Sequence, residues 1–352
     1  MNSNNNFNFL RLLFAVFVLV THSYKLSGSL VLDDLHSLTG GQIYFSYIGL
    51  YGLFALSGYL IYQSLERSKH LYLFYWKRIL RIFPALCIVL VLTILLGAIV
   101  FEGNAFDYFQ SSAMHRYFLN NVFLLKTEYD IPGIFESNPV PRMINGSLWS
   151  IPYEVMMYLS LSVLFYFSNR LKKVLVTTLF VGIVGAQLFW AKTASHYIPF
   201  LNGAYFLELA VYFYAGAMLA AWRIETIKKM SPIILVCLGL SILTMVSNTF
   251  YLSKFILLPL LVIAFGLSFW KSVSSRVIKI GDLSYGVYLY AFPIQQTLMY
   301  YFNLNAYSLM LVSLFLSMLF AYGSWHLIEK KAMLWKHNPF KKPNNSIQTS
   351  VG

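Results

Sequence analysis

The chain has 352 residues, of which 58% are hydrophobic and only 11% are charged, and its formal net charge is +13 at pH 7. A soluble domain usually contains about 25% charged residues, so this composition excludes a water-soluble globule. The apolar content also excludes a disordered chain. The Lys and Arg residues separate hydrophobic runs instead of clustering in one domain, so nucleic acid is not an expected partner. An integral membrane protein with several spans is the remaining class.

Ten hydrophobic segments approach the roughly 20 residues needed to cross a bilayer, and lipid requires them to be helical. They are residues 7–25, 43–64, 79–101, 147–168, 174–191, 203–222, 231–249, 253–270, 283–302 and 306–328. We therefore predict an all-α fold, a polytopic helical bundle forming one transmembrane domain over 1–340, with a polar tail at 341–352. The apolar stretch 116–125 is too short to cross and fits a re-entrant or interfacial piece of the longest loop, 102–146.

The distribution of positive charge predicts the orientation, because cytoplasmic loops of membrane proteins carry an excess of Lys and Arg. With ten crossings and a cytoplasmic N-terminus, twenty Lys and Arg residues fall on the cytoplasmic side and six on the other. A separate crossing by 116–125 would invert every later loop and destroy this asymmetry. We therefore expect both termini in the cytoplasm.

The first span carries two polar side chains, Arg11 near its cytoplasmic end and His22 near its outer end. Eleven residues at about 100° each bring them to the same helix face, roughly 16 Å apart along the axis. An arginine inside lipid is costly, so this face should meet protein or a watery cavity. The alternative is that both residues are interfacial, with Arg11 reaching to the headgroups and His22 at the outer end.

A basic cluster of Lys77, Arg78 and Arg81 begins the third span. Arg78 and Arg81 are three residues apart and share a helix face, where two guanidinium groups can bind phosphate bidentately. The alternative is that they only follow the positive-inside rule and contact anionic lipid headgroups. In the second span, Ser57 and Gly58 are most simply interpreted as small residues that allow close helix packing.

The segment NGSLWSIPYEV, which enters the fourth span, places Glu154 one to two turns inside the outer boundary, at about the depth expected for His22. A buried carboxylate beside a histidine can orient the ring and stabilise its protonated form. The alternative is an interfacial glutamate held by neighbouring polar groups, of which the candidates are Ser147, Trp149 and Ser150. Glu208 is a second membrane acid, but no pattern surrounds it.

An ordered set of motifs is similar to the acyltransferase-3 family of membrane O-acyltransferases. The set comprises the Arg and His of the first span, FALSGYLI, KRILRIFP, LWSIPYE and LSYGVYLYAFPI, and the similarity covers essentially the whole chain. The resemblance implies transfer of an acyl group, usually acetyl, from cytoplasmic acyl-CoA to a hydroxyl of an extracytoplasmic sugar. It also implies Arg11 and His22 as paired essential residues, Arg78 and Arg81 at the CoA phosphates, and Glu154 as a site acid.

Two positions depart from the family pattern: Ala291 stands where a histidine often follows YLY, and Glu329 is followed by lysines instead of the usual Glu-x-Pro. The first departure leaves more of the proton transfer to His22, and the second weakens any role for Glu329. On this hypothesis His22 is the general base, and Ser147, Trp149 or Ser150 contacts the oxyanion or the acceptor. A route through an acyl-histidine is the alternative mechanism.

The expected co-substrate is acetyl-CoA with no metal, and the expected partners are an extracytoplasmic glycan and membrane lipids. The composition, rich in Lys, Asn and Phe, suggests an AT-rich bacterial genome and therefore a surface polysaccharide such as lipopolysaccharide O-antigen. A transporter or flippase of a lipid-linked sugar is the alternative function, since it would also have many spans and buried ionisable residues. A membrane scaffold is a third possible function, although a scaffold would not need Arg11, His22 and Glu154 inside the bundle.

Overall fold

The fold is all-helical, as predicted, in a computed structural model that describes residues 5–124, 126–194, 201–268, 277 and 279–337. The end of the predicted span 253–270 and the tail at 341–352 lie outside these residues. In the part of the chain that the structure describes, one helix corresponds to each predicted span: α1 (Phe7–Leu26), α3 (Phe45–Glu66), α4 (Leu71–Val100), α7 (Ile151–Ser162), α8 (Asn169–Ala194), α9 (Gly203–Ala221), α10 (Ser231–Val246), α11 (Phe250–Leu267), α13 (Ser284–Phe302) and α14 (Ala306–Ser324).

Shorter elements lie between or after these helices. They are α2 (Asp34–Leu38), α5 (Ala105–Gln110), α6 (Ser112–Val122), α15 (Lys330–Met333), the 3-10 turns η1 (Gly146–Ser150), η2 (Val163–Tyr166), η3 (Ile224–Thr226) and η5 (Leu334–His337), and the π turn η4 (Trp325–Glu329). Asparagine side chains cap several helix starts: Asn202, for example, accepts the backbone N–H groups of Ala204 and Tyr205 at the start of α9. Such caps satisfy donors that have no partner within the helix.

Within the described residues, eight helical segments are long and apolar enough to cross a membrane, so the count of ten crossings stays a prediction. α10 is apolar but has only 16 residues. α13 is absent from the eight, and its sequence is rich in tyrosine and contains Gln295 and Gln296. Most of its residues are buried, because α13 packs on α1, α4 and α14. A helix surrounded by protein needs no apolar exterior, and this explains its low hydropathy.

The centre of the bundle is built where α3 packs against α9 and α1. A Cβ atom at Gly58 would lie 1.8 Å from the carbonyl oxygen of Phe213, and one at Gly216 would lie 2.0 Å from that of Ala55. The two backbones can therefore approach this closely only because both positions are glycine. The interpretation of Gly58 as a packing residue is confirmed.

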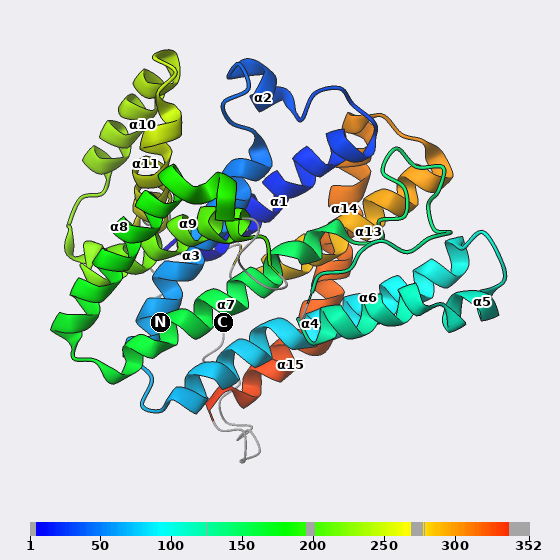
Figure 1. The fold of residues 1–352 in the computed structure, drawn as a ribbon, viewed down its shortest axis with the longest axis horizontal. Coiled ribbons are helices and arrows are strands. Elements are labelled where there is room, and N and C mark those ends of the chain that lie inside the picture. Colours follow the sequence, from blue (N-terminus) through cyan, green and yellow to red (C-terminus); the bar gives the residue numbers. More distant parts are fainter. Residues whose placement is uncertain (1–4, 125, 195–200, 269–276, 278, 338–352) are drawn as a thin grey trace.

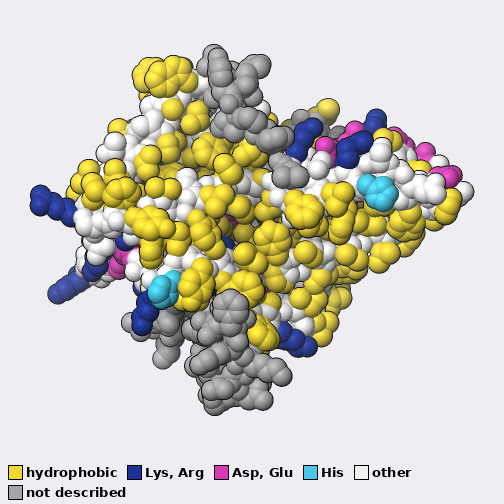
Figure 2. Space-filling view, turned by 60° about the horizontal axis from the view of Figure 1, so that its bottom comes forward, with side chains coloured by type: hydrophobic (Ala, Val, Ile, Leu, Met, Phe, Trp, Pro, Cys, Tyr) yellow, Lys and Arg dark blue, Asp and Glu magenta, His cyan; other side chains and the backbone are white. Residues whose placement is uncertain are grey.

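The outside of the molecule is apolar over a broad area. Figure 2 shows a face covered mainly by hydrophobic side chains, with Lys, Arg, Asp and Glu gathered towards its edges. Exposed large side chains occur along most long helices, including Ile99, Phe189, Val246 and Phe315. α10 and α11 form a hairpin at one side of the molecule (Figure 1). A surface of this kind suits lipid contact.

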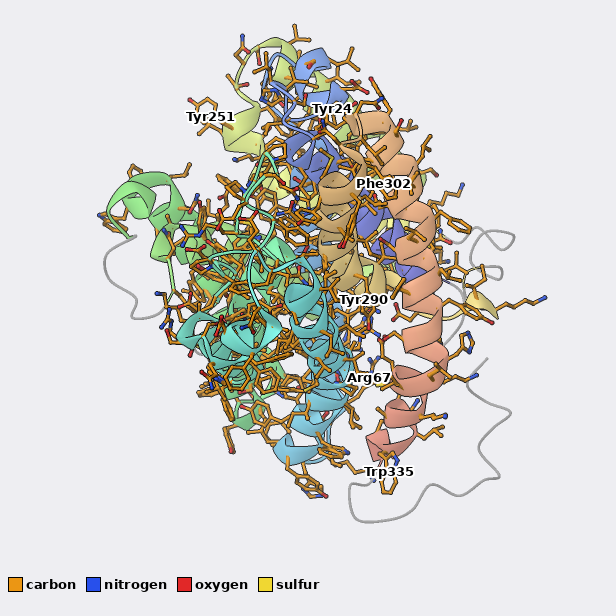
Figure 3. All side chains as sticks on the ribbon, turned by 90° about the vertical axis from the view of Figure 1, so that its right-hand side faces the viewer. Tyr24, Arg67, Tyr251, Tyr290, Phe302 and Trp335 are labelled. Carbon is orange, nitrogen blue, oxygen red and sulfur yellow. The ribbon has the colours of Figure 1, made fainter. Side chains whose placement is uncertain are left out.

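The contacts between connecting segments divide them into two ends, as repeated crossings require. At one end, Gln42 donates to Met245 O at 2.9 Å. At the other, Trp76 donates to Trp335 O at 2.9 Å. Figure 3 shows Tyr24 near the first end and Trp335 near the second. Which end faces the cytoplasm stays a prediction, based on the positive charges.

The predicted short piece at 116–125 corresponds largely to α6, which lies along α4 (Figure 1). Its buried residues Met114, Tyr117 and Asn121 follow helical spacing, and the Tyr117 hydroxyl is 2.7 Å from that of Thr93 on α4. α6 is thus an amphipathic helix attached to the bundle. Further along the same loop, Asn138 donates to Gln296 of α13, which fixes the loop over that helix.

Candidate active site

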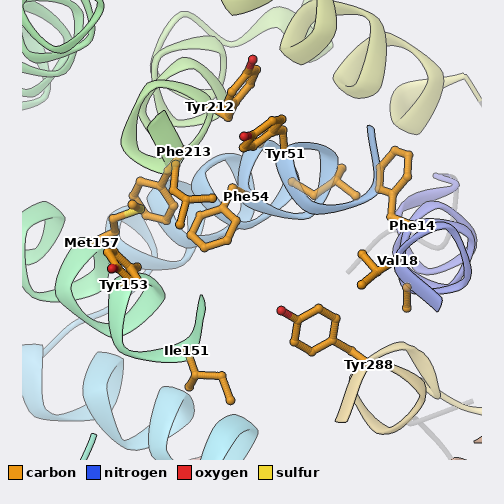
Figure 4. Packing of buried hydrophobic residues seen from close by; sticks show 14 of the residues in the cluster. Phe14, Val18, Tyr51, Phe54, Ile151, Tyr153, Met157, Tyr212, Phe213 and Tyr288 are labelled. Carbon is orange, nitrogen blue, oxygen red and sulfur yellow. The ribbon is translucent and has the colours of Figure 1, made fainter. Parts of the chain in front are cut away.

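A cavity of about 120 Å³ lies between α1, α3, α4, α7 and α13, and three arginines line it. Arg11 comes from α1, while Arg78 and Arg81 come from one face of α4, as their spacing predicted. The remaining wall is mainly apolar and aromatic. Figure 4 shows Phe54 of α3 and Tyr288 of α13, two of the lining residues, converging on the space between these helices. The sequence-predicted pair Arg78 and Arg81 is therefore joined by Arg11 in one concave site.

Asp282, just before α13, neutralises part of this charge and was missed in the sequence. Its Oδ2 atom is 2.9 Å from Arg81 Nη2 and 3.4 Å from Arg11 Nη1. Its Oδ1 atom accepts a hydrogen bond of 2.7 Å from Ser284. Burial alone would raise the pKa of Asp282, but the charges of Arg81 and Arg11 outweigh it and lower the pKa to about 2. The carboxylate is therefore ionised at any physiological pH.

Arg78 is held differently from the other two arginines. Its guanidinium carbon lies 5.7 Å from the centre of the Phe74 ring and 6.0 Å from that of Tyr158. Its Nε atom is buried and has no hydrogen-bond partner in the described part of the chain, and no ion pair there joins it to a carboxylate. A guanidinium that packs on aromatic rings and has N–H groups without a partner suits recognition of an anionic group.

Glu154 lies beside the arginines, with partners that the sequence did not predict. Its Oε1 atom accepts hydrogen bonds from Ser57, at 2.8 Å, and from Tyr158. It lines the arginine cavity, which His22 does not. No hydrogen bond or ion pair between Glu154 and His22 occurs among the described residues. The residues before α7 form the 3-10 turn η1, and Glu154 follows in the first turn of α7.

His22 lies further along α1 than the cavity and faces protein. The ring is partly buried and makes an edge contact with Phe292 of α13, at 5.3 Å between ring centres. Its Nδ1 atom is buried and hydrogen-bonds to no described residue. Native proteins rarely leave such an atom without a partner, because it costs about 1–3 kcal/mol. The buried ring nitrogen at this position is thus unpaired within the described chain.

Residues of α1 and α13 lie between the cavity and His22. On α1 the stripe between them passes through Ala15 and Val18, which are both buried. On α13, which packs along α1, Tyr288 lines the cavity and Phe292, one turn later, contacts the His22 ring. Arg11 and His22 therefore stand at two levels of α1, and the shared face predicted for them points towards α13.

The polar candidates before α7 occupy different surroundings. Ser150 lines the cavity and its hydroxyl is 2.6 Å from that of Tyr288. The Ser147 hydroxyl is buried and lacks a hydrogen-bond partner in the described chain. Trp149 packs on Tyr153 and Tyr205. Neither Ser147 nor Trp149 lines the cavity, and the same is true of Lys77.

Three further groups at or near the site escaped the sequence analysis. Tyr158 and Tyr285 resemble ordinary core aromatics in sequence, yet Tyr158 donates to Glu154, and the Tyr285 ring lies 5.7 Å from the Arg81 guanidinium. Asp282 could have been noticed as an acid on the end that is otherwise basic. The lysines that follow Glu329 depart from the family pattern and weaken the case for a role of this residue. Its side chain is buried and accepts a hydrogen bond from Ser324. No group of described His, Cys, Asp or Glu residues could hold a metal ion.

These features define a helical integral membrane protein with a buried, arginine-lined cavity. The sequence model of the acyltransferase-3 family, described as an acyltransferase domain, matches residues 4–326, so the chain belongs to that family. It is 29% identical over 348 residues to an "O-acetyl transferase" of Shigella phage Sf6, covering 94% of this chain and 96% of that protein. It is 30% identical over 216 residues to "Nodulation protein 10" of Rhizobium leguminosarum bv. viciae, covering 56% and 54%. No solved structure matches the chain.

Family membership confirms the predicted resemblance and supports O-acetyl transfer in a membrane. An acyl donor is implied by this class of enzyme. The identity of the donor, the acceptor and the roles of individual residues go beyond these comparisons.

Proposed function

We propose that the protein moves an acetyl group from cytoplasmic acetyl-CoA to a hydroxyl group of an extracytoplasmic sugar in a surface polysaccharide, such as lipopolysaccharide O-antigen. The observation that carries the proposal is the arginine cavity on α1 and α4, with His22 further along α1. Donor and acceptor would thus enter from opposite ends of α1. The membrane would be the bacterial inner membrane, with both termini in the cytoplasm.

The donor is assigned to the arginine end, where Arg78, Arg81 and Arg11 would bind the CoA phosphates and Lys77 would add positive charge. Ligand pockets usually occupy about 300–1,000 Å³, so a cavity of about 120 Å³ suits only part of a CoA-sized molecule. Its apolar wall, including Leu53, fits a pantetheine arm. The rise along α1 from Arg11 to His22 is roughly 16 Å, about half the hydrocarbon thickness, and within reach of that arm.

The acceptor is assigned to the opposite end, beside His22. A sugar hydroxyl would give its proton to a His22 ring nitrogen while its oxygen attacks the thioester carbonyl carbon. The carbon–sulfur bond then breaks, and the leaving CoA thiolate takes up the proton that His22 accepted, which returns His22 to its starting state. The Ser147 hydroxyl, buried without a hydrogen-bond partner among the described residues, is the favoured donor to the oxyanion. Ser150 and Trp149 would contact the acceptor on the α7 side.

Glu154 takes a role that follows from its observed partners. Its carboxylate lies in the same cavity as Arg78, and Tyr158 touches both residues. We assign it to holding Tyr158 and Ser57 in place and to balancing the arginine charge before the donor arrives. This replaces the sequence-based expectation of a direct contact with His22.

Mass spectrometry of surface glycans tests the proposal. Bacteria that carry the intact gene should produce glycans with a base-labile acetyl ester, and cells with a disrupted gene should produce the same glycans without it. A flippase would instead change the amount of glycan at the surface and leave its acetylation unchanged. Identical acetylation in both strains would contradict the proposed function.

A further inference from the structure

Asp282 is placed to organise the arginines without touching a ligand itself. Its Oδ2 atom is shared by Arg81 on α4 and Arg11 on α1, at 2.9 and 3.4 Å. Its side chain is 15% exposed, and it is absent from the residues that line the cavity, whereas both arginines are present. One carboxylate thus ties two helices together directly behind the cavity wall.

The carboxylate is itself fixed, and this makes the arrangement rigid. Ser284, at the start of α13, donates to its second oxygen at 2.7 Å. Close by, the Tyr285 hydroxyl donates to the backbone carbonyl of Ile82 on α4, at 3.2 Å. Both oxygens of Asp282 are therefore occupied, and the segment that carries it is attached to α4. A carboxylate so constrained sets the position of the guanidinium groups bound to it.

The three arginines consequently divide into two kinds. Arg11 and Arg81 share the charge of Asp282, while Arg78 stands against two aromatic rings, forms no ion pair in the described chain and has an Nε atom without a partner there. Without Asp282, Arg11 and Arg81 would be two like charges side by side and would repel each other. Their guanidinium groups would separate, and Arg11 stands on the helix that also carries His22.

We infer that Asp282 is a positioning residue that holds Arg11 and Arg81 in the geometry needed for acyl transfer; this inference rests on the proposed function. Substitution of Asp282 removes a negative charge near the donor, so it does not weaken attraction for the CoA phosphates. It removes the alignment of the donor with His22. The rate of transfer therefore depends on Asp282 more strongly than does the affinity for the donor.

The test compares D282N, D282E and the wild type in membrane vesicles, with radiolabelled acetyl-CoA as donor and the endogenous glycan as acceptor. D282N should lower kcat per folded molecule at least tenfold while KM for acetyl-CoA rises less than threefold. D282E keeps the charge and should restore kcat to within about threefold of the wild type. D130N is the matched control, because it breaks an exposed ion pair with Arg142 far from the cavity lining, and it should leave both constants unchanged.

Unchanged kcat in D282N would overturn the inference, as would a rise in KM with unchanged kcat. A purely structural role would lower the amount of folded protein but not the kcat of each folded molecule, and would likewise overturn it. Should D282N fail to fold, a D282E variant with less than a tenth of the wild-type kcat per folded molecule would contradict a role based on charge. Absence of labelling by the wild type would instead contradict the proposed function.

Discussion

Replacing His22 with alanine is expected to abolish transfer of acetyl groups to the glycan while the protein still folds and inserts. The ring has its Nδ1 atom buried without a hydrogen-bond partner among the described residues, so the substitution removes no internal hydrogen bond there. Loss of a general base typically lowers the rate about 10²- to 10⁴-fold. The measurement is the incorporation of acetyl label into glycan per molecule of membrane-inserted protein.

His115 provides the matched control for this substitution. It is an exposed histidine on α6, away from the residues that line the cavity. H115A should acetylate glycan at the wild-type rate. Wild-type activity in a well-expressed H22A protein would contradict the assignment of His22 as the base.

Replacing both Arg78 and Arg81 with alanine is expected to raise KM for acetyl-CoA strongly. Both guanidinium groups line the cavity, and a hydrogen bond to a charged group contributes about 1.5–3 kcal/mol, so loss of two such donors predicts at least a tenfold effect. Steady-state kinetics over a range of acetyl-CoA concentrations measures it, and direct binding of CoA to the purified protein gives an independent check.

The control for this double variant is a second pair of arginines on the same predicted side. Arg67, at the end of α3, and Arg170, in α8, are exposed and do not line the cavity. The variant R67A/R170A should keep the wild-type KM. An unchanged KM in R78A/R81A would contradict the assignment of these two residues to the donor site. A rise in KM of equal size in the control would show that the effect comes from the overall positive charge of the surface.

Much of the fold could be predicted because the local sequence determines where a membrane helix forms. Each apolar segment must satisfy its own backbone, so hydropathy places the helices without any knowledge of their packing. The basic cluster was predictable for a similar reason: Arg78 and Arg81 belong to one helix, where spacing alone determines the shared face. The close approach of α3 and α9 at Gly58 was also accessible, since small residues in a span suggest contact.

The contacts between helices could not be predicted in this way. Asp282 and Arg11 are 271 positions apart in the chain, and no local sequence pattern predicts their ion pair. Glu154 was expected near His22 because depth was counted from the ends of the spans, which ignores how α7 packs on α3 and α9. The same difficulty applies to Tyr158, since a tyrosine in a membrane helix has the same local signature whether it supports a carboxylate or only fills the core.

The central claim is that the acetyl group enters at the arginine end and leaves at the His22 end. Sealed vesicles of known orientation test it directly, because acetyl-CoA does not cross the membrane. When labelled acetyl-CoA is added outside inverted vesicles, whose cytoplasmic face points outward, labelled glycan is expected within them. Right-side-out vesicles should remain unlabelled until detergent opens them. Labelling of glycan in intact right-side-out vesicles, with none in inverted ones, would contradict transfer from the arginine end to the His22 end.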